Sequence, residues 1–375
     1  MNTPDFRAQC AQRLAQEAPR AAGMSAFVGL DGFVDEILHV VDKRESAEVY
    51  QRLPTIAKFA ERLGAAAGKS CNVELVNQVT KLGGNGPIMA NALASFGLKV
   101  TYLGLLGYPN LHPVFLPFAQ QAEVISIADP GATDALEFED GKVMVGKHGS
   151  LKHMTWENIL SRCGKERFTA KFSGANLVGF VNWTMLPYMS DIWESILKEV
   201  GPSLSGERRT IFFDLADPEK RTRQDIVRAL ELIGRFEKHF KVILGLNEKE
   251  AHQIGEVFGL KVKSDTSEAL ADFSREIAAK LPISTLVVHP TAYALAVSGG
   301  QASVVEGPFT PKPKITTGAG DHFNSGFCLG KLLGLDDATS VLTGVATSGH
   351  YVRTAESPTI KQLTDMMLHT ASWGK

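Results

Sequence analysis

Short apolar runs that alternate with amphipathic segments constrain the fold of this chain more than any other feature of its sequence. Each run is long enough for one buried strand and ends in polar or glycine residues: ANLVGFVN (175–182), RTIFFDLAD (209–217), KVILGLN (241–247) and STLVVHP (284–290). The segments between them have apolar residues at helical spacing, as at 191–200, 223–236 and 267–281. Repeated strand–helix units predict an α/β fold, with a doubly wound, mostly parallel sheet flanked by helices.

The N-terminal part of the chain fits the same plan. A buried strand at 26–30 breaks at Asp31-Gly32 and resumes as a second extended run. A glycine turn at 83–84 leads into a helix, and a strand follows at 99–107. Residues 48–68 are predicted to form a helical insert, because apolar residues recur there at helix spacing: Ile56, Phe59, Ala60 and Leu63.

One segment differs from the parallel plan. Two extended stretches flank Asp140-Gly141 within 135–149, which is a strong hairpin signal. Such a hairpin belongs outside a parallel core, so we expect a small β appendage. At 375 residues the chain exceeds one usual core, and we expect a single large domain, 1–375, that carries this appendage.

Composition excludes several classes of protein. The formal net charge is −2, with 44% hydrophobic and 21% charged residues, which is typical of a folded globular protein. A nucleic-acid or membrane-surface binder would need a basic stripe, so neither partner is expected. No apolar run is long enough to cross a bilayer, and the first 24 residues contain no apolar signal-peptide core. We therefore expect a cytoplasmic protein.

Ligands of doubly wound sheets bind outside the carboxyl ends of the strands. In this chain that rule selects five residues: Asn182, Asp214, Asp217, Asn247 and His289. Asp214 and Asp217 could serve a metal and phosphate region, or they could cap a turn, as aspartates commonly do. Four basic residues follow the hairpin and could contact a substrate or lie on a solvated surface: Lys147, His148, Lys152 and His153.

The segment TTGAGDHFNSGF (316–327) places an acid directly after a glycine turn and at the start of a helix. Gly318 and Gly320 allow the backbone to turn sharply and to approach a ligand closely. Free N–H groups and the positive end of the helix dipole then face the same point, which suits a phosphate or an oxyanion. Asp321 could take a proton from a hydroxyl there, or it could simply cap the helix. These residues alone do not decide between the two roles.

Four stretches, in order along the chain, resemble the motifs of the PfkB family of carbohydrate kinases, also called the ribokinase family. TTGAGDHFNSGF resembles the family's C-terminal motif, and the segment at 81–107, KLGGNGPIMANALASFGLKVTYLGLLG, resembles its glycine motif. GLNEKEA (245–251) is similar to the Asn-x-x-Glu motif, and GFVDEIL (32–38) to the segment with the substrate-binding acid. The matches extend from residue 29 to residue 330, and together they imply a ribokinase-like fold with a small β lid, built from segments at about 36–80 and 130–152.

The resemblance implies a role for each residue that matches a motif. Asp321 would be the catalytic base, and Gly318, Ala319 and Gly320 would form the anion hole. The nucleotide site would contain Asn247, Glu250, Thr317 and His289. Glu250 would act on Mg²⁺ through water, because Mg²⁺ keeps much of its hydration shell. Taken alone, NEKE (247–250) is equally well explained as the start of a helix with a solvated charged face.

On the substrate side, Asp35 matches the family acid that binds sugar hydroxyls, since one carboxylate can accept two hydroxyl hydrogens. Asp31 is a second candidate, although a turn-forming Asp-Gly explains it as well. Gly83 and Gly84 would let the chain pass close beneath the sugar. Asn85 would offer a donor and an acceptor to it.

Among the departures of the sequence from the family pattern, two concern the predicted ligand sites. Ile88 stands where the family usually has an asparagine, so one sugar contact is missing or has moved to Asn85. HPTAYALA (289–296) contains no glycine where the family commonly has a glycine turn near the adenine. The base pocket is therefore altered, and ATP is implied by the resemblance rather than read from these residues.

The expected function is transfer of a phosphoryl group from ATP, with Mg²⁺, to a hydroxyl of a sugar or related polyol. Two alternatives remain. The acceptor could be a nucleoside or a hydroxymethyl heterocycle, which would stack on an aromatic residue of the lid: Phe33, Phe138 or Tyr50. The protein could instead be a catalytically silent sugar sensor, although its motifs are intact. The lid has strand edges that could pair with a second copy in a homodimer.

Overall fold

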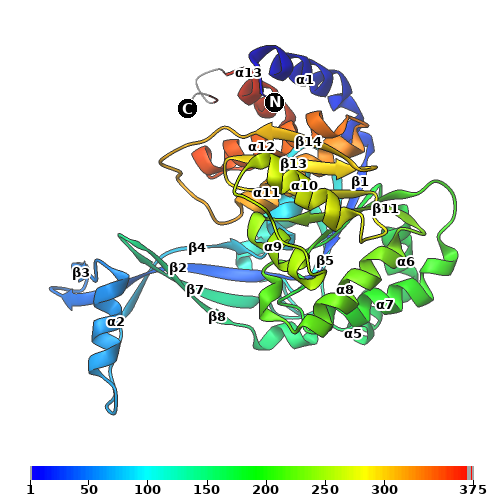
Figure 1. Ribbon diagram of the computed structural model, residues 1–375. Coiled ribbons are helices and arrows are strands. Elements are labelled where there is room, and N and C mark those ends of the chain that lie inside the picture. The colour runs from blue at the N-terminus through cyan, green and yellow to red at the C-terminus, as the bar shows by residue number, and fades with distance from the viewer. Residues whose placement is uncertain (1, 370–372, 374–375) are drawn as a thin grey trace.

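The computed structural model describes residues 2–369 and 373, and a nine-stranded sheet forms its centre (Figure 1). The strand order is β14-β13-β12-β11-β10-β9-β1-β5-β6. The nine strands are β1 (Ser25–Gly29), β5 (Lys99–Gly104), β6 (Ala122–Ser126), β9 (Leu177–Phe180), β10 (Arg209–Asp214), β11 (Phe240–Leu246), β12 (Thr285–Val288), β13 (Tyr293–Ser298) and β14 (Gln301–Glu306). Seven of them run parallel, and β13 and β14 complete one edge as antiparallel strands. The predicted α/β fold class is confirmed.

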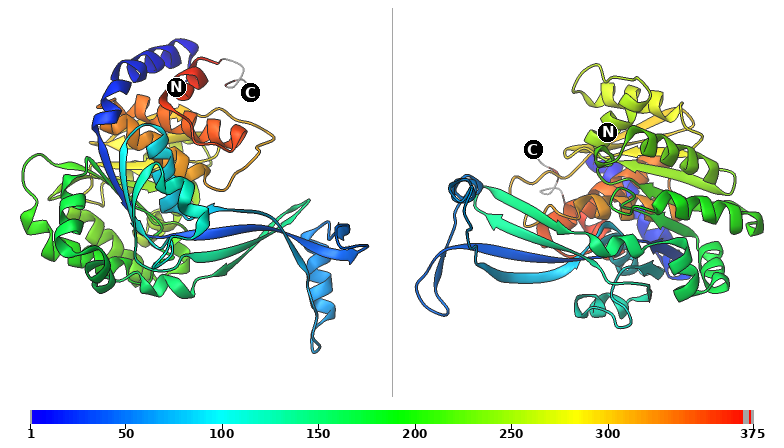
Figure 2. Two further views of the ribbon diagram at one scale, coloured as in Figure 1. Left: turned by 180° about the vertical axis from the view of Figure 1, so that it is seen from behind. Right: turned by 90° about the horizontal axis from the view of Figure 1, so that it is seen from below.

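Helices cover both faces of this sheet (Figures 1 and 2). One face carries α5 (Trp156–Cys163), α6 (Lys165–Gly174), α7 (Met189–Glu199), α8 (Arg223–Phe236), α9 (Glu248–Val257) and α10 (Ser267–Ala278). The other face carries α1 (Pro4–Glu17), α3 (Asn85–Ser95), α4 (Leu116–Ala119), α11 (Ala319–Leu332), α12 (Asp337–Thr354) and α13 (Ile360–Leu368). Alternate strand residues point into the two layers, so Phe27 joins the first core and Val28 the second.

A second sheet projects from the main body as a long arm, which is seen in both views of Figure 2. It has five strands in the order β3-β2-β7-β8, with β4 paired to β2. Their bounds are β2 (Phe33–Arg44), β3 (Tyr50–Arg52), β4 (Leu75–Gly83), β7 (Gly131–Phe138) and β8 (Gly141–Lys147). The hairpin between β7 and β8 turns at Glu139 and Asp140, as the Asp-Gly signal predicts.

The end of the arm has a small core of its own. Leu38, Val40, Leu53, Leu136 and Phe138 are buried there, and the helix α2 (Ile56–Ala65) packs on them through Ile56 and Phe59. The predicted insert at 48–68 is therefore only partly helical. Residues 50–52 form β3 instead, and Thr55 caps α2 by accepting the Lys58 N–H.

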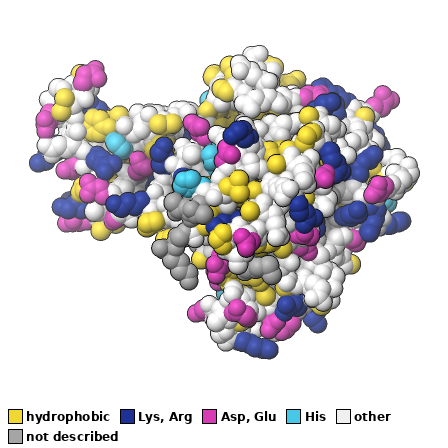
Figure 3. All heavy atoms as spheres, turned by 90° about the horizontal axis from the view of Figure 1, so that it is seen from above, with side chains coloured by type: hydrophobic (Ala, Val, Ile, Leu, Met, Phe, Trp, Pro, Cys, Tyr) yellow, Lys and Arg dark blue, Asp and Glu magenta, His cyan; other side chains and the backbone are white. Residues whose placement is uncertain are grey.

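No helix within the described residues is both long enough and apolar enough to cross a membrane. On the face seen in Figure 3, acidic and basic side chains are interspersed and neither sign forms a continuous field. This distribution matches the net charge of −2.

Candidate active site

The carboxyl ends of the sheet strands meet the base of the arm at a cavity of about 500 Å³, here called the arm cavity. Arm residues line one side: Asp35, Thr133, Met144, Gly146 and His148. Residues that follow sheet strands line the other: Asn182, Asp214, Asp217, Asn247 and His289. The strand-end rule selects all of the second group from sequence, because parallel strands deliver their carboxyl ends to one edge.

Asp321 lies in the first turn of α11 and faces the arm cavity. Gly318 occupies the N-cap position in the left-handed region (φ 91°), and no side chain caps this helix. Asp321 therefore does not serve as the N-cap. Its Oδ1 accepts a hydrogen bond from Asn85 Nδ2 at 2.9 Å. Burial raises the pKa of Asp321 to about 8, the Asn85 hydrogen bond opposes that rise, and the nearby carboxylates of Asp31 and Glu250 add to it.

Two stacked rings hold the glycine turn before Asp321 from behind. The His322 ring lies 3.6 Å from the Tyr351 ring, centroid to centroid, and the planes are 12° apart. The Tyr351 hydroxyl donates to the Thr317 carbonyl at 3.0 Å, and His322 Nδ1 contacts the Gly318 carbonyl at 2.7 Å. Since a peptide unit is planar, holding these carbonyls also fixes the direction of the N–H groups of Gly318 and Ala319. Ala319 N–H itself donates to the Thr316 carbonyl and closes the turn.

Ile88 packs against this turn from the other side. A Cβ built on Gly318 would lie 3.3 Å from two carbon atoms of Ile88 and 3.2 Å from the Tyr351 hydroxyl. The residue that departs from the family pattern is therefore a support for the glycine turn, and it does not line the arm cavity. Apolar packing at this point also explains why a side chain without hydrogen-bonding groups is accepted there.

Asp35 lies in β2 with 6% of its surface exposed and faces the arm cavity. Burial raises its pKa, while Lys81 and the Thr133 hydroxyl oppose the rise. Gly83 pairs with Phe33 on the neighbouring strand, and a Cβ at Gly83 would come within 2.4 Å of the Asp35 carboxyl group. Any side chain at position 83 would therefore displace this carboxylate, which explains the glycine. Gly84 follows with φ at 93° and lines the cavity.

Asp31 is placed differently from Asp35. It is completely buried and does not line the arm cavity. Its carboxylate accepts hydrogen bonds from the backbone N–H groups of Asn85 and Gly86 at 3.0 and 2.9 Å. Asn182 Nδ2 adds a third at 2.7 Å. Burial raises the pKa of Asp31 to about 6, and these hydrogen bonds oppose the rise.

Asn247 and Glu250 form a capping box at the start of α9. Glu250 Oε2 accepts the Asn247 N–H at 2.8 Å, and Oε1 accepts the Asp217 N–H at 2.9 Å. Burial raises the pKa of Glu250, and these backbone hydrogen bonds oppose the rise. The helix-start interpretation of NEKE therefore holds, yet both residues also line the arm cavity.

Asp214 adds a third acid on the same side of the cavity. Asn324 Nδ2 donates to its Oδ2 at 2.8 Å, while Asn324 Oδ1 is buried without a partner among the described residues. Burial raises the pKa of Asp214 well above its usual range, and the carboxylates of Glu250 and Asp321 raise it further. Amide and backbone groups, rather than basic side chains, offset the charges of Asp214 and Asp321, so the cluster favours a bound cation or bound protons.

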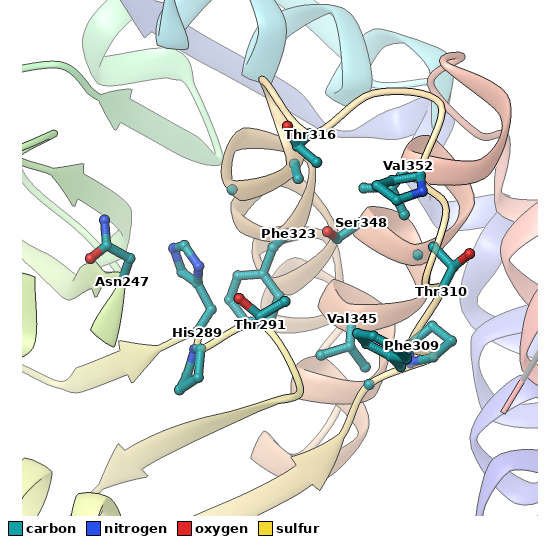
Figure 4. A pocket seen from close by; sticks show the side chains of 17 residues that line it. Asn247, His289, Thr291, Phe309, Thr310, Thr316, Phe323, Val345, Ser348 and Val352 are labelled. Atoms are coloured by element: carbon teal, nitrogen blue, oxygen red, sulfur yellow. The ribbon is translucent and has the colours of Figure 1, made fainter. Parts of the chain in front are cut away.

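A second cavity of about 370 Å³, here called the helix cavity, lies beside α11 and α12 (Figure 4). Phe323, Val345 and Val352 form its helical wall, and the segment 307–316 closes the opposite side. Arg353 holds that segment by donating to the carbonyls of Pro308 and Phe309. An apolar slot with a few hydroxyl groups, from Thr291, Thr310 and Ser348, suits a planar aromatic ring.

The two cavities share a boundary. Asn247, His289 and Gly320 line both of them, so the glycine turn lies where the cavities meet. The His289 ring contacts the Phe323 ring with centroids 4.8 Å apart and planes tilted by 38°, and burial lowers the pKa of His289 to about 4. Thr317 is exposed and lines the arm cavity. A molecule in the helix cavity could thus present one end to Asp321.

The basic and aromatic candidates from the sequence lie partly in the arm cavity and partly elsewhere on the arm. His148 lines the arm cavity, whereas Lys147 forms an ion pair with Asp134 at 2.8 Å on the outside of the arm. Of the three aromatic candidates for stacking, Phe33 alone is among the residues that line the cavity; Phe138 is in the core of the arm, and Tyr50 bonds to His39 near its end.

Sequence reasoning missed several residues around Asp321. Thr133 and Tyr351 lie far from Asp321 in the chain and outside the four motifs, whereas Asn324 lies within the C-terminal motif but was given no role. The role of His322 could have been predicted from sequence. It directly follows Asp321 in the first helical turn, where side chains point back toward the preceding glycine turn.

The sheet order and the β arm give this protein a ribokinase-like fold. The family model and the curated relative described next make it a carbohydrate kinase. Within that class the chain belongs to the prokaryotic ketohexokinase family, whose model matches residues 2–369.

A curated relative of this chain is also named as a ketohexokinase. The ketohexokinase of Haloferax volcanii is 32% identical over 370 residues, which cover 97% of this chain and 96% of the relative.

Solved structures share the fold at lower identity. Arabidopsis thaliana ribokinase, complexed with ribose and ATP, has a TM-score of 0.63 and 15% identity, covering 92% of this chain and 98% of that one. Phosphofructokinase-2 from Escherichia coli, in complex with fructose-6-phosphate, has a TM-score of 0.62 and 12% identity, covering 93% and 99%. The predicted family and the predicted carbohydrate kinase class are therefore confirmed.

Proposed function

We propose that this protein transfers the γ-phosphoryl group of ATP to a hydroxyl group of a ketohexose. One observation carries the proposal: the buried Asp321 carboxylate faces the arm cavity at the boundary that this cavity shares with the helix cavity. The family match and the curated ketohexokinase direct the choice of sugar.

The sugar occupies the arm cavity, with Asp35 accepting hydrogen bonds from its hydroxyl groups. The reacting hydroxyl gives its proton to an Asp321 carboxylate oxygen while its own oxygen forms a bond to the γ-phosphorus. The bond from that phosphorus to the β–γ bridging oxygen breaks, and ADP leaves with the bridging oxygen. The N–H groups of Gly318 and Gly320 hold the oxygens of the transferring group, where the dipole of α11 favours negative charge.

The nucleotide occupies the helix cavity, with the adenine between Phe323, Val345 and the segment 307–316. Its phosphates extend past His289 and Gly320 toward Asp321. Thr317 and Asn247 then lie beside the transferring group. The Asn247 Nδ2 group has no hydrogen bond within the described chain and is available to a phosphate oxygen.

The acids fit an indirectly held Mg²⁺. Both Glu250 oxygens already accept backbone N–H groups, so Glu250 would hold the ion through water, and Asp214 lines the same cavity. Among the described residues no group of three or more His, Cys, Asp or Glu is arranged to bind a metal directly. When bound, Mg²⁺ would neutralise charge that develops on the phosphates.

The arm acts as a lid in this proposal. Asp35, Thr133 and Met144 already lie over the cavity, so a small inward movement of the arm would exclude water from the reacting atoms. Water that remained would compete with the sugar for the phosphoryl group.

An ADP-release assay with a panel of acceptors tests the proposal. Ketohexoses, aldohexoses, pentoses and nucleosides are compared with Mg-ATP, and a ketohexose is expected to give the highest kcat/KM. Asp321→Asn should lower kcat about 10²–10⁴-fold because the base is lost. Asp272→Asn, on the surface of α10, is the matched control and should behave like the wild type.

Three outcomes would contradict parts of the proposal. A nucleoside as the best acceptor would replace the sugar with the nucleoside alternative. Calorimetric binding of a sugar without any binding of Mg-ATP would identify a sensor. Normal turnover by Asp321→Asn would remove Asp321 from the role of base.

A further inference from the structure

The wall of the helix cavity presents side-chain hydroxyl groups to a ligand, and none of the residues that line it is charged (Figure 4). The hydroxyl groups belong to Thr291, Thr310, Thr316 and Ser348. None of these four hydroxyls forms a hydrogen bond with another described residue. A hydroxyl group can donate one hydrogen bond or accept two, and it rotates to suit its partner. The wall therefore offers hydrogen bonds whose direction is not fixed.

Two lining side chains do carry donors or acceptors in a fixed arrangement, Asn247 and His289. Both also line the arm cavity, so they lie at the boundary of the two cavities. The proposed function places the phosphates at that boundary. The remaining lining residues, which surround the space for the base, include no amide or carboxylate side chain.

The backbone along this wall has few free polar groups. Three of the lining residues are prolines, which have no N–H: Pro290, Pro308 and Pro313. Arg353, which does not line the cavity, donates to three lining carbonyls at 3.0, 2.8 and 2.8 Å, those of Pro308, Phe309 and Gly349. Most of the fixed groups that would recognise the edge of a base are therefore missing or already paired.

Aromatic and apolar side chains form the rest of the wall. Phe309, in the segment 307–316, has 55% of its surface exposed, and Phe323 and Val345 lie on the helical side. Contact with an aromatic ring does not distinguish one purine from another, because every base has a π face. Such contact holds a base without reading its polar edge.

Purines differ from one another at that polar edge. Adenine has a donor in its 6-amino group and an acceptor at N1, whereas guanine and hypoxanthine have a 6-oxo acceptor and a donor at N1. A rotating hydroxyl satisfies either pattern. A site with fixed hydrogen-bonding groups behaves differently, because the wrong ligand leaves those groups unpaired and is rejected by about 10⁴–10⁵-fold.

We propose that the phosphoryl donor of this protein is a purine nucleoside triphosphate with either a 6-amino or a 6-oxo group, so that GTP and ITP serve as well as ATP. This inference rests on the proposed function, which places the nucleotide in the helix cavity, and it defines the class of donor. Phe309 is the residue that holds the base, and it contributes equally to the affinity for all three purines.

The first experiment compares Mg²⁺ complexes of ATP, GTP, ITP and CTP at a saturating concentration of ketohexose. Chromatography of the nucleoside diphosphate that is released gives the rate for each donor. The values of kcat/KM for GTP and ITP should lie within about tenfold of the value for ATP, far from the discrimination of a site with fixed groups. CTP should be poorer, because a single ring covers less of the apolar wall. A preference for ATP over GTP of more than about tenfold would overturn the inference.

Two variants test the residues. Phe309→Ala should raise the KM values of ATP and GTP by the same factor, about 5–100-fold for one lost stacking contact, with the sugar KM unchanged. Ser348→Ala should change kcat/KM for ATP and GTP by similar factors, because its hydroxyl serves either base. A loss with ATP alone, in either variant, would show that adenine is read there and would contradict the inference. Leu116→Ala, which removes a 52% exposed apolar side chain from α4, is the matched control and should leave every KM unchanged.

Calorimetry of the wild type with ADP, GDP and IDP separates this inference from the proposed function. Similar affinities for ADP and GDP in a protein that phosphorylates no sugar would support the inference and defeat the proposed transfer. Binding of ADP without GDP would overturn the inference and leave transfer from ATP intact. Binding of no nucleotide would defeat both.

Discussion

Asp321 is surrounded by other acids at the point where the two cavities meet. Burial, together with the carboxylates of Asp31 and Glu250, raises its pKa to about 8, and Asn85 limits the rise. A general base works best when its pKa lies near the working pH, because a stronger base accepts a proton more readily. The residue that makes the site reactive is therefore also the residue that makes it sensitive to pH.

The value of kcat/KM for the sugar is expected to rise with pH. A carboxylate with a raised pKa is protonated below that pKa and cannot accept a proton, so the active form predominates only above about 8. Below that pH, kcat/KM should fall about tenfold for each unit, and above it the profile should level off. Initial rates across a buffer series give the profile, and a flat profile between about pH 6 and 8 would contradict it.

The Asp321→Asn variant is the control for this profile. Its residual activity should lose the rising limb, because the group that titrates has been replaced. A limb that persists in this variant would belong to another acid, and Asp35, whose pKa burial also raises, would be the first candidate.

At the residue scale, the sequence identified most of the residues that line the arm cavity but not the role of each one. Asp35, Asn247, His289 and Asp321 line the arm cavity as their motifs and strand ends predict. Asp31 could not be assigned from sequence. Whether a carboxylate near a glycine turn faces a ligand or a helix start depends on packing, and no local pattern reports that packing.

At the scale of elements, the start of α11 is held by contacts between two helices. His322 of α11 stacks on Tyr351 of α12, and both rings bond to carbonyls of the glycine turn. The Ser357 hydroxyl lies 2.9 Å from His322 Nε2, and burial lowers the pKa of His322 to about 4. A neutral ring that donates from Nδ1 and accepts at Nε2 satisfies both contacts.

Replacing His322 should loosen the anion site without emptying the cavities. His322→Leu removes the donor to the Gly318 carbonyl, so kcat should fall about tenfold, as expected for one lost hydrogen bond at a preorganised site. His322→Asn keeps a nitrogen donor near the Nδ1 position and should recover most of the loss. Steady-state kinetics and melting temperatures of both variants make the comparison, and equal losses in the two would show that ring packing, not the hydrogen bond, matters.

Element prediction was accurate where strands and helices alternate and weaker in the arm. Six main-sheet strands, β1, β5 and β9 to β12, follow predicted apolar runs, because these central strands are largely buried on both faces. β6, β13 and β14, at the two edges, were not predicted. β4 was not foreseen, since its residues are largely exposed and its pairing partner β2 lies far away in sequence. The insert at 48–68 was predicted as one helix, because tertiary pairing of residues 50–52 with β2 is invisible to a periodicity count.

At the scale of the whole molecule, the large exposed apolar side chains of the described residues are concentrated on the arm, the smaller part of the structure. Half of the twelve large exposed hydrophobic side chains lie on it: Val49, Leu63, Leu75, Val79, Met144 and Val145. The register places Val79, Ile37, Ala135 and Met144 in one row across β4, β2, β7 and β8. That row is on the same face as Asp35, since side chains two residues apart share a face. An apolar row beside a cavity mouth suits a partner surface.

We expect two copies to associate through these arms, and Val79→Glu tests the interface. Val79 is 52% exposed in the single chain and would be buried in the expected interface. A glutamate at this position would bury a charge there, so it should weaken the dimer. The sugar KM should rise, because the partner arm would no longer cover the cavity. Val227→Glu, on α8, is the matched control and should leave the mass unchanged. Sedimentation velocity measures the mass of the wild type and of both variants in solution. If wild type and Val79→Glu sediment with the same mass, whether as monomers or as dimers, the arm does not form the interface.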